Sequence, residues 1–202
     1  LKEGRPVPSE GSPRPGDLKF ADLSGPDGVP DGKIDLDYDR EIIGDPFPDV
    51  SMSLNLNWGW KGIDFNIFWQ AVLGRDMYNQ GPMVVPFYND DGNVWKELVD
   101  KRWTADNPTN AYPRLNANRQ TKLSDWWVED GSFVRIQTMT LGYSIPFSKK
   151  DAARKVRLYI SADNLYTFTG FEGYDPEVGM TGIYSGGYPR LRKWTFGADF
   201  TF

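Results

Sequence analysis

The sequence predicts an all-β fold of antiparallel strands, of the kind that closes into a transmembrane β-barrel. Three observations support it. Five segments alternate apolar with polar residues, their connections alternate between long and short, and the chain ends on the aromatic residue Phe202. Side chains of an extended strand point alternately to two faces, so each segment has one apolar and one polar face. An outer-membrane barrel strand has this pattern because one face meets lipid and the other a wet lumen.

The last segment, residues 193–202, shows the alternation most clearly. Its apolar face carries Trp194, Phe196, Ala198, Phe200 and Phe202. Its polar face carries Lys193, Thr195, Gly197, Asp199 and Thr201. An amphipathic strand that closes a soluble β-sandwich alternates in the same way, so this segment alone leaves both folds open.

Four further segments have the same period. Residues 51–58 and 63–71 are predicted to pair as a hairpin around the short turn 59–62, and residues 133–145 and 156–163 supply the next two strands. Strands of about 9–11 residues cross a bilayer when they are tilted. The chain therefore supplies roughly five strands.

The connections between these strands follow the order long, short, long, short, long. If Phe202 lies on the periplasmic side, the short turns 59–62 and 146–154 lie there too. The long loops are then all extracellular: 1–49, 74–130 and 169–189. Barrels join strands in this way, whereas a soluble sandwich gives no reason for it.

Two local irregularities are also predicted. Val134 and Ile136 are out of phase with the apolar residues later in the same strand, which indicates a bulge or a strand that rises above the membrane. Within the longest connection, residues 94–102 have the composition of a short helix.

Composition excludes several classes of protein. The chain of 202 residues has a formal net charge of −5, which makes nucleic acid an improbable partner. It has no Cys and no His, which removes disulfides, thiolate sites, and the usual nucleophile–base pairs. No run approaches the ~20 apolar residues of a membrane helix. Because it begins at Leu1 rather than Met, we expect a processed or truncated product.

Enzymatic activity is not expected, and no catalytic residue is assigned. Paired carboxylates, as in a glycosidase, are the one catalytic arrangement left without His or Cys. Nothing in the spacing selects a pair, and solvated loop acids are the simpler explanation of the candidates: Asp125, Glu129, Asp130, Asp175 and Glu177.

An acidic segment between residues 22 and 39 has the spacing of a calcium loop. Oxygen ligands recur every second or third residue, and glycines permit the sharp turn that brings them round a hard cation. The candidate ligands are Asp22, Ser24, Asp27, Asp31, Asp35 and Asp39. Residues 25–30 resemble an insertion and the last ligand position has no Glu, so a metal-free acidic surface loop remains the alternative. No organic cofactor is expected.

Short motifs in a fixed order resemble the C-terminal part of SusC/RagA-family TonB-dependent transporters. The last residues match the family's ending, in which a glycine precedes two aromatic residues. The other matching segments run nearly end to end through the chain: 16–20, 42–46, 61–65, 102–104, 124–135, 140–143, 163–169, 173–177 and 187–189. The sequence departs from the family in its expanded acidic loop, and it contains no plug domain and no TonB box.

The resemblance implies an integral outer-membrane barrel of 22 strands, of which this chain supplies about the last five. It divides the chain into an extracellular loop, 1–49, and barrel strands with their loops, 50–202. It further implies import of oligosaccharides, or of peptides, with a SusD-like surface lipoprotein as a lid and the TonB complex as the source of energy. A secreted soluble β-sandwich that binds carbohydrate remains the alternative.

The same resemblance suggests roles for particular residues. Gly197, Phe200 and Phe202 would form the signal that the barrel assembly machinery reads, and the apolar faces would contact outer-membrane lipid. Loop aromatics would stack on sugar rings or meet the lid protein, although girdle or loop packing explains each of them as well. These aromatics are Trp103, Tyr112, Trp126, Trp127, Tyr174, Tyr184 and Tyr188.

Overall fold

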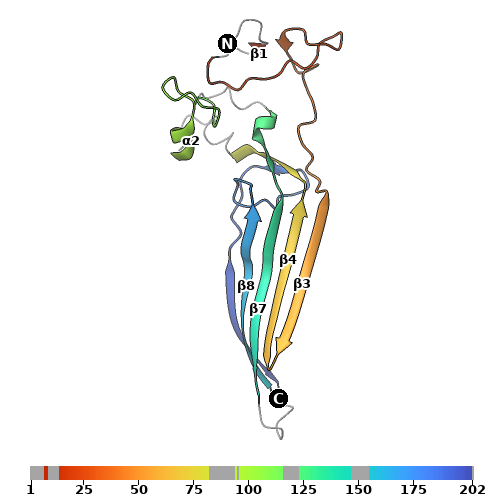
Figure 1. Ribbon diagram of the computed structural model, residues 1–202, viewed down its shortest axis with the longest axis vertical. Helices are drawn as coiled ribbons and strands as arrows, with labels where there is room; N and C mark the ends of the chain where they lie inside the picture. Colours follow the sequence, from red (N-terminus) through yellow and green to blue (C-terminus); the bar gives the residue numbers. More distant parts are fainter. Residues whose placement is uncertain are drawn as a thin grey trace. The chain divides into compact units, whose positions relative to one another are not determined.

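The computed structural model describes residues 7–8, 14–81, 94, 96–115, 123–146 and 155–201. The chain forms two compact units, each built from two separate stretches of sequence (Figure 1). The first unit comprises residues 1–44 and 78–128, and the second comprises residues 45–77 and 129–202.

The second unit is built on one antiparallel sheet of five strands. These are β3 (Val50–Trp60), β4 (Ile63–Leu73), β7 (Phe133–Ile145), β8 (Lys155–Thr169) and β10 (Lys193–Thr201). Their order in the sheet is β10–β8–β7–β4–β3, and every neighbouring pair is antiparallel (Figure 1). The five strands expected from the alternation are therefore confirmed.

The apolar residues of all five strands lie in register on one face of this sheet. Directly paired residues of antiparallel strands point to the same face. One continuous row across the sheet is Leu56, Ile67, Met139, Ala162 and Trp194. The next row is Trp58, Phe65, Leu141, Ile160 and Phe196. Several large side chains of this face are exposed, and Phe196 is 76% exposed.

A bulge explains the irregular phase of β7. The pairing of β7 with both neighbouring strands shifts between Ile136 and Thr138, and opposite this point Asn164 of β8 has a φ of 51°. The shift returns the earlier residues to the apolar face, where Ile136 pairs with Trp69 of β4. Of the two predicted explanations, the bulge is the one observed.

The ends of the strands confirm the predicted alternation of connections. Lys61 and Gly62 turn β3 into β4 with φ values of 47° and 86°, as a two-residue turn between right-twisted strands requires. At the same end of the sheet Ile145 of β7 pairs with Val156 of β8. The long connections leave from the opposite end, because neighbouring strands run in opposite directions. Residues 147–154 of the second short turn lie outside the described residues.

Among its described residues, the first unit contains a parallel pair of very short strands, β1 (Val7–Pro8) and β2 (Lys33–Ile34), and short helical segments. Helix α2 (Lys96–Lys101) confirms the helix expected in the long connection, and η1 (Asp125–Trp127) is a 3₁₀ turn. Leu98 and Trp127 form the buried core of this unit, and four half-buried residues pack on it: Leu18, Tyr78, Tyr112 and Leu115.

Two smaller features complete the fold. A three-stranded sheet has the order β6 (Val128–Asp130), β5 (Asp76–Asn79), β9 (Ile183–Tyr184). In the second unit a hydrophobic cluster contains Met77, Phe171 and Tyr184. Among the described residues, no helix is long and apolar enough to cross a membrane.

Candidate functional site

The polar face of the five-stranded sheet carries a connected set of charges. Arg157 of β8 donates from Nε and Nη2 to the two carboxylate oxygens of Asp64 on β4, at 2.9 and 2.6 Å. Its Nη1 donates to Asp199 of β10 at 3.0 Å. One guanidinium thus links β8 to β4, across β7, and to its neighbour β10.

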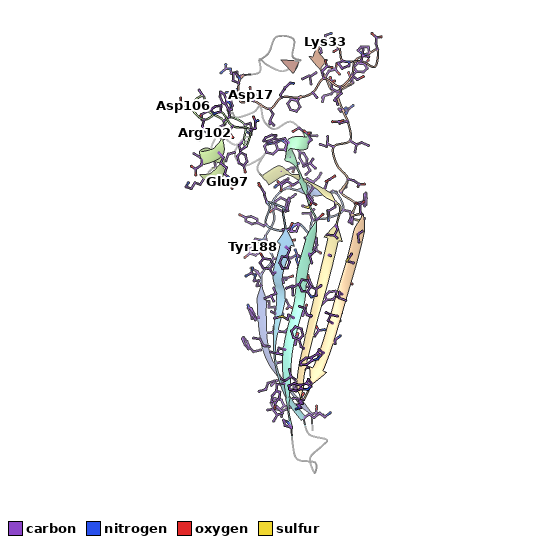
Figure 2. The ribbon with its side chains drawn as sticks, viewed as in Figure 1. Asp17, Lys33, Glu97, Arg102, Asp106 and Tyr188 are labelled. Carbon is purple, nitrogen blue, oxygen red and sulfur yellow. The ribbon has the colours of Figure 1, made fainter. Side chains whose placement is uncertain are left out.

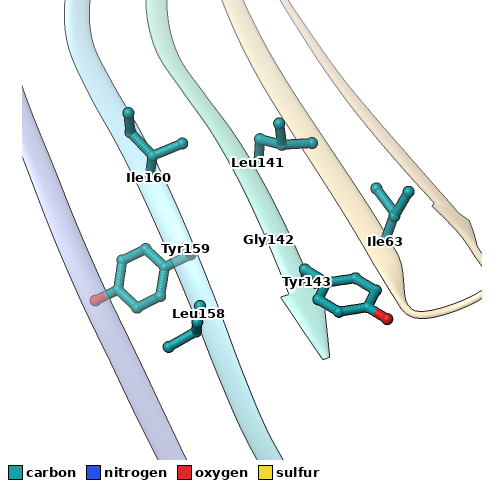
Figure 3. Close-up of a pocket in the computed structure, with 7 residues that line it drawn as sticks. All are labelled: Ile63, Leu141, Gly142, Tyr143, Leu158, Tyr159 and Ile160. Atoms are coloured by element: carbon teal, nitrogen blue, oxygen red, sulfur yellow. The ribbon is translucent and has the colours of Figure 1, made fainter. Parts of the chain in front are cut away.

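Glycines on this face make room for the large side chains beside them. A row across the sheet reads Gly59, Asp64, Gly142, Tyr159 and Gly197. A Cβ at Gly142 would lie 2.7 Å from Nε of Arg157, and a Cβ at Gly197 would overlap the ring of Tyr159. Figure 3 shows Tyr159 reaching from β8 toward β10. The guanidinium of Arg157 stacks on that ring at 4.9 Å from its centroid.

A shallow hollow of about 420 Å³ lies over β4, β7 and β8 around Gly142 (Figure 3). Apart from Gly142 and Tyr159, it is lined by side chains of the apolar face: Ile63, Leu141, Tyr143, Leu158 and Ile160. Its lining offers few polar groups for a soluble ligand, so we do not regard it as the substrate site.

An arginine cluster, formed by Arg135, Asp175, Glu177 and Arg190, lies farther along the polar face. Arg135 of β7 is 1% exposed, and its Nη1 donates to Glu177 at 2.6 Å. Its Nη2 donates to both oxygens of Asp175 at 2.9 and 3.0 Å, and its Nε to Thr167 at 2.8 Å. Arg190 contacts the same two carboxylates from the loop, at 3.2 and 3.0 Å. Two positive and two negative charges therefore balance.

The arginine cluster holds the loop between β8 and β10 against the sheet. A second hollow, of about 270 Å³, lies where Asp175, Glu177 and Arg190 meet the segment 183–188 of that loop. Tyr188 lines it and is 83% exposed (Figure 2). The sequence did not identify Arg135. The available signal was an arginine on the polar side of a strand, followed by two acids in the long loop after the next strand.

Most of the candidate glycosidase carboxylates are engaged in other contacts. Asp175 and Glu177 meet, but two arginines lie against them. Glu129 accepts the backbone N–H of Glu172, and Asp130 accepts that of Ser132. Asp125 is the first residue of η1, in the other unit. Their geometry assigns no acid–base pair.

The candidate contact aromatics fall into three groups. Trp127 and Tyr184 are buried in the two hydrophobic clusters. Trp103 and Tyr112 are half-buried, and the backbone N–H of Trp103 donates to the carbonyl of Tyr112 at 2.9 Å. The exposed ones are Trp126, Tyr174 and Tyr188. The side chains of these last three residues are therefore accessible at the surface.

The acidic loop is organised around Asp39. Its Oδ1 accepts the backbone N–H groups of Leu23 and Ser24 at 2.7 and 3.2 Å, and its Oδ2 accepts that of Asp35 at 2.8 Å. The hydrogen bond from Asp35, with those from Leu23 and Ser24, lowers the pKa of Asp39 below its ordinary value of 3.8, although desolvation opposes the shift. The loop is thereby closed by hydrogen bonds of its own.

The other candidate calcium ligands are spread around this loop. Asp22 accepts the N–H of Gly32, Asp35 accepts that of Asp37, and Asp31 accepts that of Lys33. Asp27 is exposed in the turn that the Gly28-to-Gly25 hydrogen bond closes. Within the described ranges, no three acidic residues lie close enough together to hold a metal ion. Calcium at Asp22, Ser24, Asp27, Asp31, Asp35 and Asp39 stays a prediction.

We expect this loop to open in acid. A carboxylate whose pKa is lower in the folded than in the unfolded state adds stability above its unfolded pKa, and this stability is lost as the pH falls through the folded pKa. Amide hydrogen exchange in residues 22–39, corrected for the intrinsic pH dependence, should therefore accelerate below about pH 4. Asp39→Asn should accelerate it at neutral pH, whereas Asp27→Asn should not. Equal exchange in both variants would contradict the assignment.

The predicted assembly signal is only partly described. Gly197 lies beneath the ring of Tyr159, and Phe200 pairs with Val156 on the apolar face. Phe202 lies outside the described residues. A role in recognition by assembly machinery stays a prediction.

Comparison with known proteins gives consistent matches. No protein-family model matches the chain. It is 34% identical over 205 residues to TonB-dependent receptor P3 of Formosa agariphila, covering 95% of this chain and 20% of that protein. TonB-dependent receptor P26 of the same organism is 31% identical, over 93% of this chain and 20% of that protein. TonB-dependent receptor SusC of Bacteroides thetaiotaomicron is 28% identical, over 94% of this chain and 18% of that protein.

Solved structures show the same fold. The RagAB peptide importer in its open-open state matches with a TM-score of 0.71 and 24% identity, over 92% of this chain and 21% of that one. Its closed-closed state matches with a TM-score of 0.71 and 22% identity, over 91% of this chain and 21% of that one. The chain thus spans about a fifth of the length of the relatives it matches.

Proposed function

Because the chain belongs to the SusC/RagA family of TonB-dependent transporters, we propose that its five strands form part of the wall of an outer-membrane barrel that imports nutrients. The activity proposed is that of the whole transporter, of which this chain is about one fifth. It is transport without catalysis.

The observation that carries this proposal is the apolar face that runs in register across all five strands. Strands β3 and β4 have 11 residues each, enough for a tilted strand to span the hydrocarbon layer. A soluble sandwich would bury such a face against a second sheet, whereas here Trp58, Trp194 and Phe196 of this face are exposed. Lipid is the partner that fits a wide, uncharged face.

The edges of the sheet fit the same proposal. β3 and β10 are each hydrogen-bonded on one side only within the described part of the chain. An open sheet edge in lipid leaves backbone groups unsatisfied, so both edges need further strands. In the proposed barrel the remaining strands of the transporter close the wall between them.

We propose that the long loops face the cell exterior, where a SusD-like lipoprotein covers them. Tyr174 and Tyr188 lie on the loop that the arginine cluster holds in place, and Trp126 lies near the end of the longest connection. Exposed rings suit stacking on sugars or packing against a peptide. The substrate is an oligosaccharide or a peptide. Growth of a transporter-deletion strain on each as sole carbon source would assign the class.

Cysteine labelling of intact cells tests the topology. The chain has no cysteine, so Tyr188→Cys and Lys61→Cys each introduce one thiol into this part of the transporter. We expect a membrane-impermeant maleimide to label Tyr188→Cys in intact cells, and Lys61→Cys only after the outer membrane is permeabilised. Labelling of Lys61→Cys in intact cells, or recovery of the transporter in the soluble fraction, would refute the proposal.

A further inference from the structure

Arg75 is a buried cation without a counter-ion in the described part of this chain. It lies between the end of β4 and the start of β5, and it is 8% exposed. Its Nε and Nη2 are buried and have no hydrogen-bond partner there. Burying a guanidinium is unfavourable unless its N–H groups are paired.

The side chain is held where it is by close packing. The backbone N–H of Gly131 donates to the carbonyl of Arg75 at 2.9 Å. A Cβ at Gly131 would lie 3.3 Å from Cγ of Arg75 and would overlap the fully buried Met77. Glycine at position 131 thus lets the stem of Arg75 lie directly against the backbone, with Met77 beside it.

Three carboxylates close to Arg75 in the chain or the sheet accept backbone hydrogen bonds from other residues. Asp76 accepts the backbone N–H of Asp45 at 3.0 Å, and Asp45 accepts that of Phe47 at 2.9 Å. Asp130, next to Gly131, accepts that of Ser132 at 2.8 Å. Each of these acids closes a local turn or joins neighbouring segments.

Arg135 in the same unit shows how this fold satisfies a buried arginine. Its Nε, Nη1 and Nη2 bond Thr167, Glu177 and Asp175 respectively. Both arginines are more than nine-tenths buried, yet only Arg135 has acidic partners within the described residues. The contrast indicates that the partner of Arg75 lies outside the described residues.

We propose that Arg75 binds a carboxylate side chain supplied by the part of the transporter outside this chain. This inference rests on the proposed function, because about four fifths of a relative such as receptor P3 lies outside the matched region. A permanent partner fits better than a transported substrate or a free anion. Burial of the Arg75 charge is unfavourable whether or not substrate is present. Because Arg75 is only 8% exposed, a bound substrate or anion would exchange with solvent slowly.

Replacing Arg75 by methionine in the complete transporter tests this by the sign of a stability change. If a carboxylate pairs with Arg75, Arg75→Met leaves that carboxylate buried alone, and the midpoint of thermal unfolding in detergent should fall by more than about 2 °C. If Arg75 has no partner, methionine removes a buried charge and the midpoint should rise, which would overturn the proposal. Arg135→Met is the control. Because the acidic partners of Arg135 are known, its midpoint of thermal unfolding should fall.

Two further measurements separate the remaining outcomes. Arg75→Lys keeps the charge, so it should assemble even if Arg75→Met fails to. Failure of both would show that shape rather than charge matters and would overturn the proposal. Adding sodium formate should leave the midpoint of the wild type unchanged. If formate raises the midpoint of the wild type but not that of Arg75→Met, Arg75 would instead be a site for free anions. The cysteine labelling described above does not depend on Arg75. It can therefore show that the proposed function fails, separately from any failure of the proposal for Arg75.

Discussion

Replacing Arg135 by methionine is expected to destabilise the folded transporter by about 3 kcal/mol, the lower end of the range for breaking a buried ion pair. The change removes a guanidinium that is 1% exposed and bonded to Thr167, Asp175 and Glu177. Arg190 still contacts both carboxylates, which is why we expect the lower end. The midpoint of urea unfolding in detergent should fall accordingly.

Arg190→Met is the matched control for this prediction. Arg190 bonds the same two carboxylates, but its side chain is 40% exposed, so water can replace it. We expect a loss of at most about 1 kcal/mol, as for exposed pairs. Equal losses in the two variants would show that burial of Arg135 does not decide the strength of the arginine cluster.

The consequence for function is the position of the loop between β8 and β10. Asp175 and Glu177 are the points at which this loop is tied to β7 through Arg135. In Arg135→Met we expect protease to cleave residues 170–189 of the intact barrel faster than in Arg190→Met. Unchanged cleavage would mean that the hydrophobic cluster of Met77, Phe171 and Tyr184 holds the loop alone.

Replacing Gly197 by alanine is expected to destabilise the sheet by about 1–3 kcal/mol, the usual cost of overpacking. A Cβ at this position would overlap the ring of Tyr159. The ring has little freedom to move, because Arg157 stacks on it and is itself bonded to Asp64 and Asp199. The midpoint of urea unfolding of the complete transporter again reports the effect.

A double variant distinguishes this packing role from recognition by assembly machinery. If Gly197 makes room for the ring, Tyr159→Ser should remove most of the cost of Gly197→Ala, measured against Tyr159→Ser alone. If Gly197 is needed only as an assembly signal, Gly197→Ala should impair assembly equally whether position 159 is Tyr or Ser. Gly187→Ala is the matched control, since nothing lies within 4 Å of its added Cβ. It should leave both stability and assembly unchanged.

The sequence by itself determined the strands and how they are connected. Period-two alternation is a local property, because each side chain's face depends only on its place along its own strand. The out-of-phase residues Val134 and Ile136 even indicated where β7 bulges. The turn residues Lys61 and Gly62 likewise lie between two well-patterned strands. These features needed no knowledge of which strands are neighbours.

Only the tertiary structure decided which side chains meet across the strands. Arg135 and its acids are about 40 residues apart in sequence, as are Arg157 and Asp199. Alternation gives the face of a residue but not its cross-strand partner, because a shift of register by two residues keeps every face and changes every pair. For the same reason the sequence could not distinguish buried Trp127 from exposed Trp126, or show that Arg75 is buried without a partner in the described part of this chain.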